Sequence, residues 1–306
     1  MKVSIELPTW LGDTIMASPA IENLINYCSD SEITLIGSDI AIEAMKNHPK
    51  VTKTYVLEKN YISLYRTILS MEEFDIFVSF RGSIRSKLIK FCISARTKYQ
   101  FDKNIYKQGH QVEKYNNFVN DSFNINSIPS RLILHTEKKM KGKNKLVGLN
   151  PGASYGNSKR WYPKEFAAVA NDLSRNYDII IFGGPGEKDI ATEIEGYLIK
   201  YGVDNYQNLA NKTSVTELIS HISSLDLFIT GDSGPMHIAA ALQVPTVTIF
   251  GPTNDKVTSQ WMNTKNTIVK KNLDCQPCMK RTCPLSHHNC MAFIKSIEVL
   301  DAVKTL

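Results

Sequence analysis

The sequence predicts an α/β protein made of two Rossmann-like halves, and three observations support this fold class. Short apolar runs alternate with helix-length segments along most of the 306 residues. A strand leads through a glycine-containing turn into a helix at the N-terminus, and the same order recurs at Leu227–Phe250. The alternation breaks in a lysine-rich stretch at residues 138–145 and then restarts. We therefore predict two domains, residues 1–143 and 144–306.

The first half is expected to contain four strands with helices between them. The strands are short apolar or β-branched runs, predicted at Lys2–Leu7, Ile33–Ile36, Val51–Val56 and Asp75–Ser79. Helices with apolar residues at helical spacing are predicted at residues 15–25, 40–47, 61–71 and 84–91. Residues 100–130 are polar and asparagine-rich and support no assignment, whereas Leu132–Leu134 is predicted as a short strand.

The second half repeats this pattern. Its strands are predicted at Leu146–Asn150, Asp178–Phe182, Leu227–Thr230 and Thr246–Phe250. Its helices are predicted at residues 163–175, 187–201, 215–224 and 296–306. The last of these helices closes the chain, and we expect it to pack back on the N-terminal domain.

A further helix is predicted to open at the carboxyl end of the strand Leu227–Thr230. The turn Gly231–Gly234 precedes Pro235, which suits the first turn of a helix. Free backbone N–H groups and the positive end of the helix dipole make such a position an anion site. Asp232 is either a cap of this helix or a residue that orients the loop against a ligand. His237 is either a packed side chain or a donor to a phosphate.

The net charge of +6 lies entirely in the first half of the chain. Residues 1–145 hold 21 Lys and Arg against 15 Asp and Glu, whereas the remainder holds 15 of each. A basic first half suggests an anionic partner, but no zinc-finger, helix-turn-helix or RNP pattern supports nucleic acid. No apolar run approaches the ~20 residues of a membrane span, and the N-terminus lacks a secretory signal pattern. We therefore expect a cytoplasmic protein without a transmembrane segment.

The usual nucleotide-binding motifs are missing. There is no GxxxxGK[ST] motif, Gly183–Gly186 does not fit GxGxxG, and no two Asp residues have the Asp-x-Asp spacing that holds a metal-bound diphosphate. A bound diphosphate would instead be neutralised by the helix N-terminus and by Lys159 in the loop 151–161. Asp13, in the turn after the first strand, is either a cap of the first helix or a general base.

Four of the six cysteines lie in one short segment. Their spacing is C-x2-C-x4-C-x6-C, formed by Cys275, Cys278, Cys283 and Cys290, with His287 and His288 nearby. In the cytoplasm, such a cluster favours thiols or metal over disulfides. Structural zinc, a small buried thiol cluster and an oxidation-prone pair all agree with this spacing, and catalysis requires none of them.

Four segments together resemble the heptosyltransferases of lipopolysaccharide core assembly, glycosyltransferase family 9. They are PTWLGDTIMASPAI, NPGASYGNSKRW, GDSGPMHIAAALQVPTVTIFGPT and CQPCMKRTCPLSHHNC. They run from the first strand to the cysteine segment, and residues 40–130 match least. The resemblance is greatest to the enzymes that add the second heptose. It implies a GT-B fold, with two Rossmann-like domains facing each other across a cleft, the acceptor bound by the N-terminal domain and the donor by the C-terminal domain.

The resemblance also implies roles for particular residues. The family's catalytic Asp falls on Asp13, and its donor-phosphate lysine falls on Lys159. Its Asp-[Ser/Thr]-Gly-x-x-His element falls on Asp232, Ser233, Gly234 and His237. Ser154 and Tyr155 occupy the stretch where related enzymes carry hydroxyl groups facing the diphosphate, and a tyrosine there departs from the family pattern.

The implied activity is inverting, metal-independent transfer of heptose from ADP-L-glycero-D-manno-heptose. The implied acceptor is an anionic lipid A–Kdo–heptose at the inner face of the cytoplasmic membrane, so the protein would be peripheral to that membrane. The basic turn with Arg81, Arg85 and Lys87 is a candidate for binding this acceptor, and a solvated helix N-terminus is the alternative.

Other functions remain alternatives. A family 9 heptosyltransferase acting at another core position is the nearest. A nucleotide-sugar epimerase of the same fold would need no lipid acceptor. A non-catalytic nucleotide- or metal-binding protein would have the cysteine segment as its functional core. The sequence leaves open the acceptor hydroxyl, the donor epimer and the oligomeric state.

Overall fold

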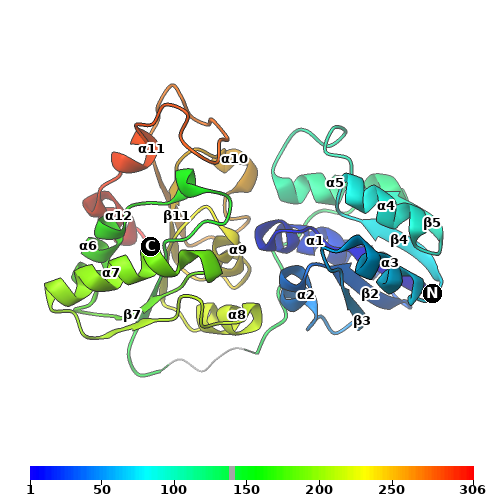
Figure 1. Cartoon of the computed structure of the whole chain (residues 1–306), viewed down its shortest axis with the longest axis horizontal. Helices are drawn as coiled ribbons and strands as arrows, with labels where there is room; N and C mark the ends of the chain where they lie inside the picture. The colour runs from blue at the N-terminus through cyan, green and yellow to red at the C-terminus, as the bar shows by residue number, and fades with distance from the viewer. Residues whose placement is uncertain (138–141) are drawn as a thin grey trace. The chain divides into compact units, whose positions relative to one another are not determined.

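A computed structural model describes residues 1–137 and 142–306. The chain divides into two compact units, Met1–Thr136 and Glu137–Leu306. Each unit contains one all-parallel sheet with helices on its faces, as the predicted α/β class requires (Figure 1). Residues 138–141 of the predicted connection lie outside the described part of the chain. No helix within the described ranges is long and apolar enough to span a membrane.

The first sheet has the strand order β3-β2-β1-β4-β5. Its strands are β1 (Lys2–Glu6), β2 (Glu32–Gly37), β3 (Val51–Val56), β4 (Phe74–Ser79) and β5 (Ala95–Gln100). The chain runs outward from β1 to β3 and then returns to place β4 beside β1. This reversal creates a crevice at the carboxyl ends of β1 and β4, which is where ligands bind in open α/β sheets.

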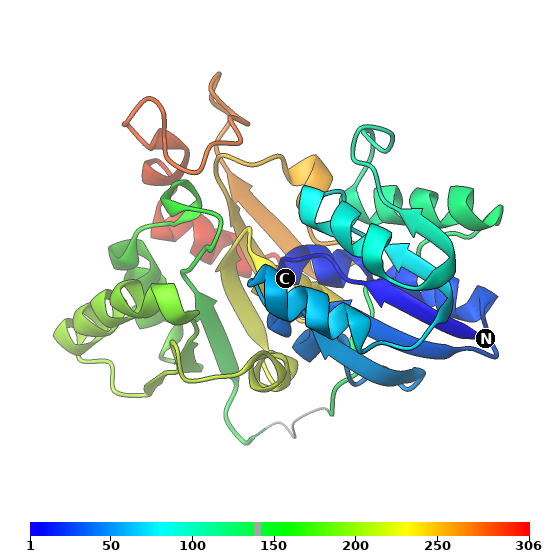
Figure 2. The same ribbon diagram turned by 45° about the vertical axis from the view of Figure 1, so that its right-hand side comes forward.

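Helices cover both faces of the first sheet. They are α1 (Leu11–Tyr27), α2 (Asp39–Met45), α3 (Tyr61–Leu69), α4 (Ile84–Cys92) and α5 (Gln111–Phe123). Helix α1 packs against α2 and α5, whereas α3 packs against α4 (Figure 2). The connections from β1 to β3 run in one direction along the sheet, and those from β3 to β5 run in the other. Because such crossovers are right-handed, the two groups of helices lie on opposite faces. The inner side chains of α3 and α4 share a core with β4, formed by Leu64, Ile68, Phe74, Phe77 and Ile89.

The second sheet has the order β11-β10-β9-β6-β7-β8. Its strands are β6 (Leu146–Asn150), β7 (Asp178–Ile181), β8 (Tyr206–Asn208), β9 (Leu227–Gly231), β10 (Thr246–Phe250) and β11 (Asn266–Lys270). Its α-helices are α6 (Pro163–Leu173), α7 (Lys188–Tyr201), α8 (Val215–Ser223), α9 (Gly234–Ala241), α10 (Asp255–Thr258), α11 (Asn289–Ala292) and α12 (Ser296–Val303). The order again reverses between neighbouring strands, β6 and β9, so the second crevice lies at their carboxyl ends.

The last helix uses its buried face within the second unit. Val299 and Ala302 belong to the core that β6, β9 and β10 build, and α12 contacts α6, β10 and β11. The apolar side of the helix is therefore occupied by its own unit. Packing of α12 on the first unit, as expected from the sequence, stays a prediction.

Some elements differ from the expectation. Leu132–Leu134, predicted as a short strand, is not a strand. Leu132 is buried, and the backbone N–H of Ile133 donates to the Ser18 hydroxyl of α1 at 2.8 Å. This backbone is therefore bonded to a helix and not to a neighbouring strand. Strand β5 was not predicted because its polar residues suit the edge of a sheet. Helix α5 was not predicted because residues 100–130 are polar and asparagine-rich; its N-cap is His110, an uncommon residue there, which forms a capping box with Glu113.

Candidate functional site

A lysine–aspartate pair lies at the carboxyl end of β9 in the second unit. The Lys159 ammonium is 2.6 Å from Oδ2 of Asp232 and donates to the Asp232 carbonyl oxygen at 3.1 Å. Only 12% of the lysine side chain and 5% of the aspartate side chain are exposed. The structure thus joins two residues that lie 73 positions apart and that the sequence assigned to one donor site.

The contacts of Asp232 show that its carboxylate does not cap α9. Its Oδ2 also accepts a hydrogen bond of 2.6 Å from the Thr253 hydroxyl, which follows β10. Helix α9 begins after Ser233 without a side-chain cap, so capping is not what Asp232 does. Its carboxylate instead fixes the ammonium of Lys159 beside the start of α9. Thr253 is a site residue that the sequence analysis missed.

Ser233 is held by the neighbouring strand. Its hydroxyl accepts from the Asn150 amide at 3.2 Å, and Asn150 ends β6, the strand next to β9. Gly234 is the first residue of α9, and His237 is buried in its first turns with 2% exposure. The β9–α9 turn is therefore anchored from β6, with the amino end of α9 directed to the carboxyl edge of the sheet.

Tyr155 joins the lysine to the cysteine segment. The Lys159 ammonium lies 4.7 Å from the centre of the Tyr155 ring, a cation–π contact, and the Arg281 guanidinium lies 5.5 Å from the same ring. The Tyr155 hydroxyl donates to the Met279 carbonyl at 2.7 Å. Ser154, its neighbour, is exposed. Tyr155 therefore has a structural role, because it docks the lysine loop on residues 279–281.

The cysteine segment braces the loop that carries Lys159. The Ser158 hydroxyl donates to the Lys280 carbonyl at 2.5 Å, and the Ser158 N–H donates to the Arg281 carbonyl at 3.2 Å. His288 Nε2 is 2.8 Å from the Ser158 carbonyl oxygen. Gly156 has a positive φ of 155°, and a Cβ there would lie 2.4 Å from the Arg281 carbonyl oxygen. Only glycine allows the two backbones to approach so closely.

The four clustered cysteines line one small cavity of about 20 Å³, together with Ser158 and His288. Burial raises the pKa of the Cys290 thiol to about 11, and the thiols of Cys278, Cys283 and Cys275 add to the shift. A cavity of this size holds roughly one water molecule or ion. The four sulfur atoms do not meet at one point, because no three of them all lie within 4.8 Å of one another. Metal binding by this cluster stays a prediction.

Among the described residues, one group has three possible metal-ligand atoms within 4.8 Å of one another: Glu22, His48 and His135. Nε2 of His48 is 2.9 Å from Glu22 Oε2, and its Nδ1 accepts from the backbone N–H of Lys50 at 3.1 Å. Because Nδ1 accepts, Nε2 carries the proton and donates to Glu22. This group is therefore a hydrogen-bonded cluster beneath α1, and His48 has no lone pair left for a metal.

Asp13 lies in the first turn of α1, at the carboxyl end of β1 in the first unit. The N-cap of α1 is Trp10, so Asp13 does not cap the helix. Burial and the negative charge of Asp13 raise the pKa of Tyr115 well above its ordinary value, and a hydrogen bond to Asp13 adds to this shift while one to Gln111 opposes it. Tyr115, from α5, thus stays protonated and orients the Asp13 carboxylate. No sequence signal identified Tyr115, because α5 itself was not predicted.

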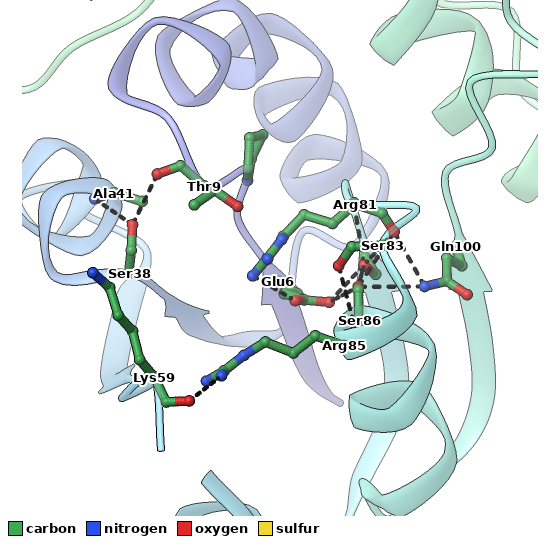
Figure 3. A network of polar contacts seen from close by, with 12 residues as sticks. Glu6, Thr9, Ser38, Ala41, Lys59, Arg81, Ser83, Arg85, Ser86 and Gln100 are labelled. Atoms are coloured by element: carbon green, nitrogen blue, oxygen red, sulfur yellow. Dashed lines mark hydrogen bonds and ion pairs between the residues drawn. The ribbon is translucent and has the colours of Figure 1, made fainter. Parts of the chain in front are cut away.

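A buried carboxylate at the carboxyl end of β1 holds together a network of polar contacts (Figure 3). Glu6, the last residue of β1, is fully buried; Oε2 accepts from the Ser79 hydroxyl at 2.6 Å and also from the Ser86 hydroxyl. Arg81 donates to Oε1 at 3.1 Å. Burial raises the pKa of the Glu6 carboxyl, whereas these hydroxyl groups and the charge of Arg81 lower it. The sequence analysis missed this network, because its partners lie more than 70 residues apart in the chain.

The three basic residues predicted to bind the acceptor differ in their surroundings. Arg81 is paired with Glu6 and its side chain is 15% exposed. Arg85 donates to the Lys59 carbonyl oxygen (Figure 3). It also donates to the Glu58 carbonyl oxygen and lies over the Tyr61 ring, so it ties α4 to the start of α3. Lys87 is exposed on α4. All three lie at or near the amino end of α4, and acceptor binding by them stays a prediction.

Comparison with known proteins identifies the family. The profile described as glycosyltransferase family 9 (heptosyltransferase) matches residues 62–289, well over half of the chain. The chain belongs to glycosyltransferase family 9. The family resemblance and the GT-B fold expected from the sequence are thereby confirmed, and the heptosyltransferase fold accounts for the two all-parallel sheets.

Relatives that align with this chain over nearly their whole length are named as one kind of family 9 enzyme. The chain is 40% identical to lipooligosaccharide heptosyltransferase 2 of Campylobacter jejuni subsp. jejuni serotype O:2, over 100% of this chain and 98% of the relative. It is 38% identical to the protein of the same name from serotype O:6, over 100% and 99%. Among solved structures, E. coli ADP-heptose lps heptosyltransferase II matches with a TM-score of 0.83 at 20% identity, over 100% of this chain and 98% of that one.

Proposed function

We propose that the protein is a heptosyltransferase II, which moves heptose from ADP-L-glycero-D-manno-heptose to the first heptose of the lipopolysaccharide or lipooligosaccharide inner core. The observation that carries this proposal is the 40% identity, over the whole chain, to a family 9 enzyme named lipooligosaccharide heptosyltransferase 2. The geometry of the second-unit crevice agrees with a diphosphate donor, because an ammonium and a helix N-terminus lie together there.

In this proposal the second unit binds ADP-heptose. As the bond between the anomeric carbon and the β-phosphate oxygen breaks, its electron pair leaves with ADP, and negative charge grows on that phosphate. Lys159 and the N–H groups at the start of α9 supply the positive charge that a divalent cation supplies in other nucleotide-sugar enzymes. Asp232 and Thr253 hold Lys159 in place. Ser233 and Tyr155 position the two loops.

The first unit binds the acceptor, with Asp13 as the general base. The acceptor hydroxyl attacks the anomeric carbon from the face opposite the leaving phosphate, so the configuration inverts. Its proton passes to the Asp13 carboxylate, which Tyr115 orients. Arg81, Arg85 and Lys87 lie at the amino end of α4, where cations suit the phosphate and carboxylate groups of a lipid A–Kdo–heptose. The enzyme would work in the cytoplasm, at the inner face of the membrane that carries this acceptor.

Another family 9 activity, at a different core position, is the alternative. The decisive experiment incubates the protein with ADP-heptose and either lipid A–Kdo or lipid A–Kdo–heptose, and determines product mass and linkage. Transfer only to the acceptor that already has one heptose is the expected result. Transfer to lipid A–Kdo alone would assign the first core position instead, and no transfer to either acceptor would contradict the proposal.

A further inference from the structure

The two helices α3 and α4 have apolar side chains on their outer faces as well as on their inner ones. Leu64 and Ile68 of α3 and Ile89 of α4 face the core and are nearly inaccessible. The outer side chains form a second apolar stripe: Tyr61, Ile62, Tyr65 and Leu69 on α3, and Ile84, Leu88 and Phe91 on α4. Their exposure ranges from 42% for Leu88 to 86% for Ile84. We call these seven residues the outer face.

The outer face has the spacing of a helix surface, so it is not a chance scatter of apolar residues. On α3, positions 61, 65 and 69 repeat every four residues, and on α4 positions 84, 88 and 91 repeat at four and three. The helices pack side by side (Figures 1 and 2), so the two stripes are neighbours. Exposed apolar patches of this kind usually mark a surface that meets a membrane or a partner.

The charged residues within the two helices are all positive. Tyr61–Leu69 and Ile84–Cys92 contain no Asp or Glu, but they contain Arg66, Arg85, Lys87 and Lys90. The ammonium of Lys98 on β5 lies 3.5 Å from the Phe91 carbonyl oxygen and adds a fifth cation. Glu72, which follows α3, is neutralised by Lys2 and Lys53. Helix α7 of the second unit differs in its charges, because its exposed Ile199 shares the helix with the acids Asp189, Glu193 and Glu195.

We propose that the outer face of α3 and α4 docks the protein on a bilayer of anionic phospholipid. Aromatic and aliphatic side chains enter the interface between headgroups and acyl chains, while Arg and Lys remain at the level of the phosphates. A bilayer suits this surface better than a protein because the four cations of the two helices, with no acid among them, complement a uniformly anionic plane. The proposal rests on the proposed function in one respect, that the acceptor is lipid-linked. The docked surface lies on the first unit, which also carries Asp13 and Arg81.

Vesicle flotation with the full chain tests the proposal. Wild-type protein is expected to float with vesicles containing phosphatidylglycerol, to bind phosphatidylcholine vesicles much more weakly, and to dissociate as salt is raised. The test variant is Leu69→Glu with Phe91→Glu, at the carboxyl ends of the two helices and away from the proposed acceptor residues. It is expected to partition onto anionic vesicles roughly tenfold less, because two apolar groups are lost and two like charges are added.

Matched variants separate docking from folding. Ile199→Glu makes the same change at a 64% exposed position near the end of α7, and it is expected to bind vesicles as the wild type does. Phe91→Trp keeps an interfacial aromatic ring and should also retain binding. All variants should keep the wild-type melting temperature and the wild-type rate with a soluble, deacylated acceptor. Equal vesicle binding by wild type and the double Glu variant would overturn the proposal.

Two further outcomes have defined meanings. A dimer that forms at micromolar concentration and is abolished by the double Glu variant, without vesicle binding, would make the outer face an interface between copies of the chain and overturn the proposal. Vesicle binding that depends on Leu69 and Phe91 in a protein without heptosyl transfer would support the docking surface while the proposed function fails.

Discussion

At the scale of single residues, the proposed donor-binding lysine and the proposed catalytic base are each held by a partner. Lys159 is fixed by Asp232, and Asp13 is oriented by Tyr115. The sequence identified Lys159, Asp232 and Asp13 because they lie in turns that follow strands. It missed Tyr115 and Thr253, because their contacts depend on segments that are distant in sequence.

Replacement of Asp13 by Asn should abolish most turnover while ADP binding remains. The amide keeps the shape of the side chain and the Tyr115 contact but cannot take the acceptor proton, so kcat is expected to fall by about 10²–10⁴. Steady-state kinetics and calorimetric titration with ADP measure the two quantities separately. Wild-type turnover in this variant would remove Asp13 from the mechanism.

Lys159→Ala is expected to weaken ADP binding by about 10- to 100-fold, because a charge-assisted contact to the diphosphate is lost. The same change leaves the buried Asp232 without its cation, so it should also lower stability, by up to about 3–5 kcal/mol for a buried pair. A second variant separates these effects. Lys159→Met with Asp232→Asn removes both charges and should recover stability but not ADP affinity. Recovery of ADP affinity in the double variant would mean that Lys159 serves only to neutralise Asp232.

At the scale of elements, the cysteine segment lies against the loop that carries Lys159. Residues 279–281 accept hydrogen bonds from Tyr155 and Ser158, and the segment therefore determines where the Lys159 loop lies. The sequence predicted the cluster of cysteines from their spacing. Its docking on the donor loop followed only from the fold, because the two segments are more than 120 residues apart.

Zinc binding by the cysteines can be tested together with this bracing. Elemental analysis of protein purified without added metal decides between the alternatives: one zinc per chain that Cys278→Ser with Cys283→Ser loses would show a structural zinc, whereas metal-free protein would leave a thiol cluster or an oxidation-prone pair. The same variant should bind ADP several-fold more weakly, because the brace of the Lys159 loop loosens. Cys92→Ser, at a thiol of the first unit, is the matched control. Unchanged ADP affinity in the double variant would contradict the bracing of the Lys159 loop by this segment.

At the scale of the whole molecule, the chain consists of two units, each with its own sheet and core. The proposed roles divide in the same way, with the donor on the second unit and the base on the first. If this division holds, the double variant Asp13→Asn with Lys159→Ala should have the same ADP affinity as Lys159→Ala alone, since Asp13→Asn by itself is expected to leave ADP binding unchanged and independent sites contribute additively. Calorimetry on the three proteins measures this. An interaction energy above about 0.5 kcal/mol would show that donor binding draws on the first unit.

The sequence by itself determined the α/β class, most strands of both sheets and the turn residues Asp13, Lys159 and Asp232. These depend on local periodicity, glycine and proline signals and short motifs, all of which are written in neighbouring residues. The tertiary structure decided what each polar group pairs with. Glu6 with Arg81, Asp13 with Tyr115, and the cysteine segment with the Lys159 loop are pairings of segments far apart in sequence. The outer face of α3 and α4 is of the same kind, because apolar spacing alone does not tell which stripe of a helix the core will cover.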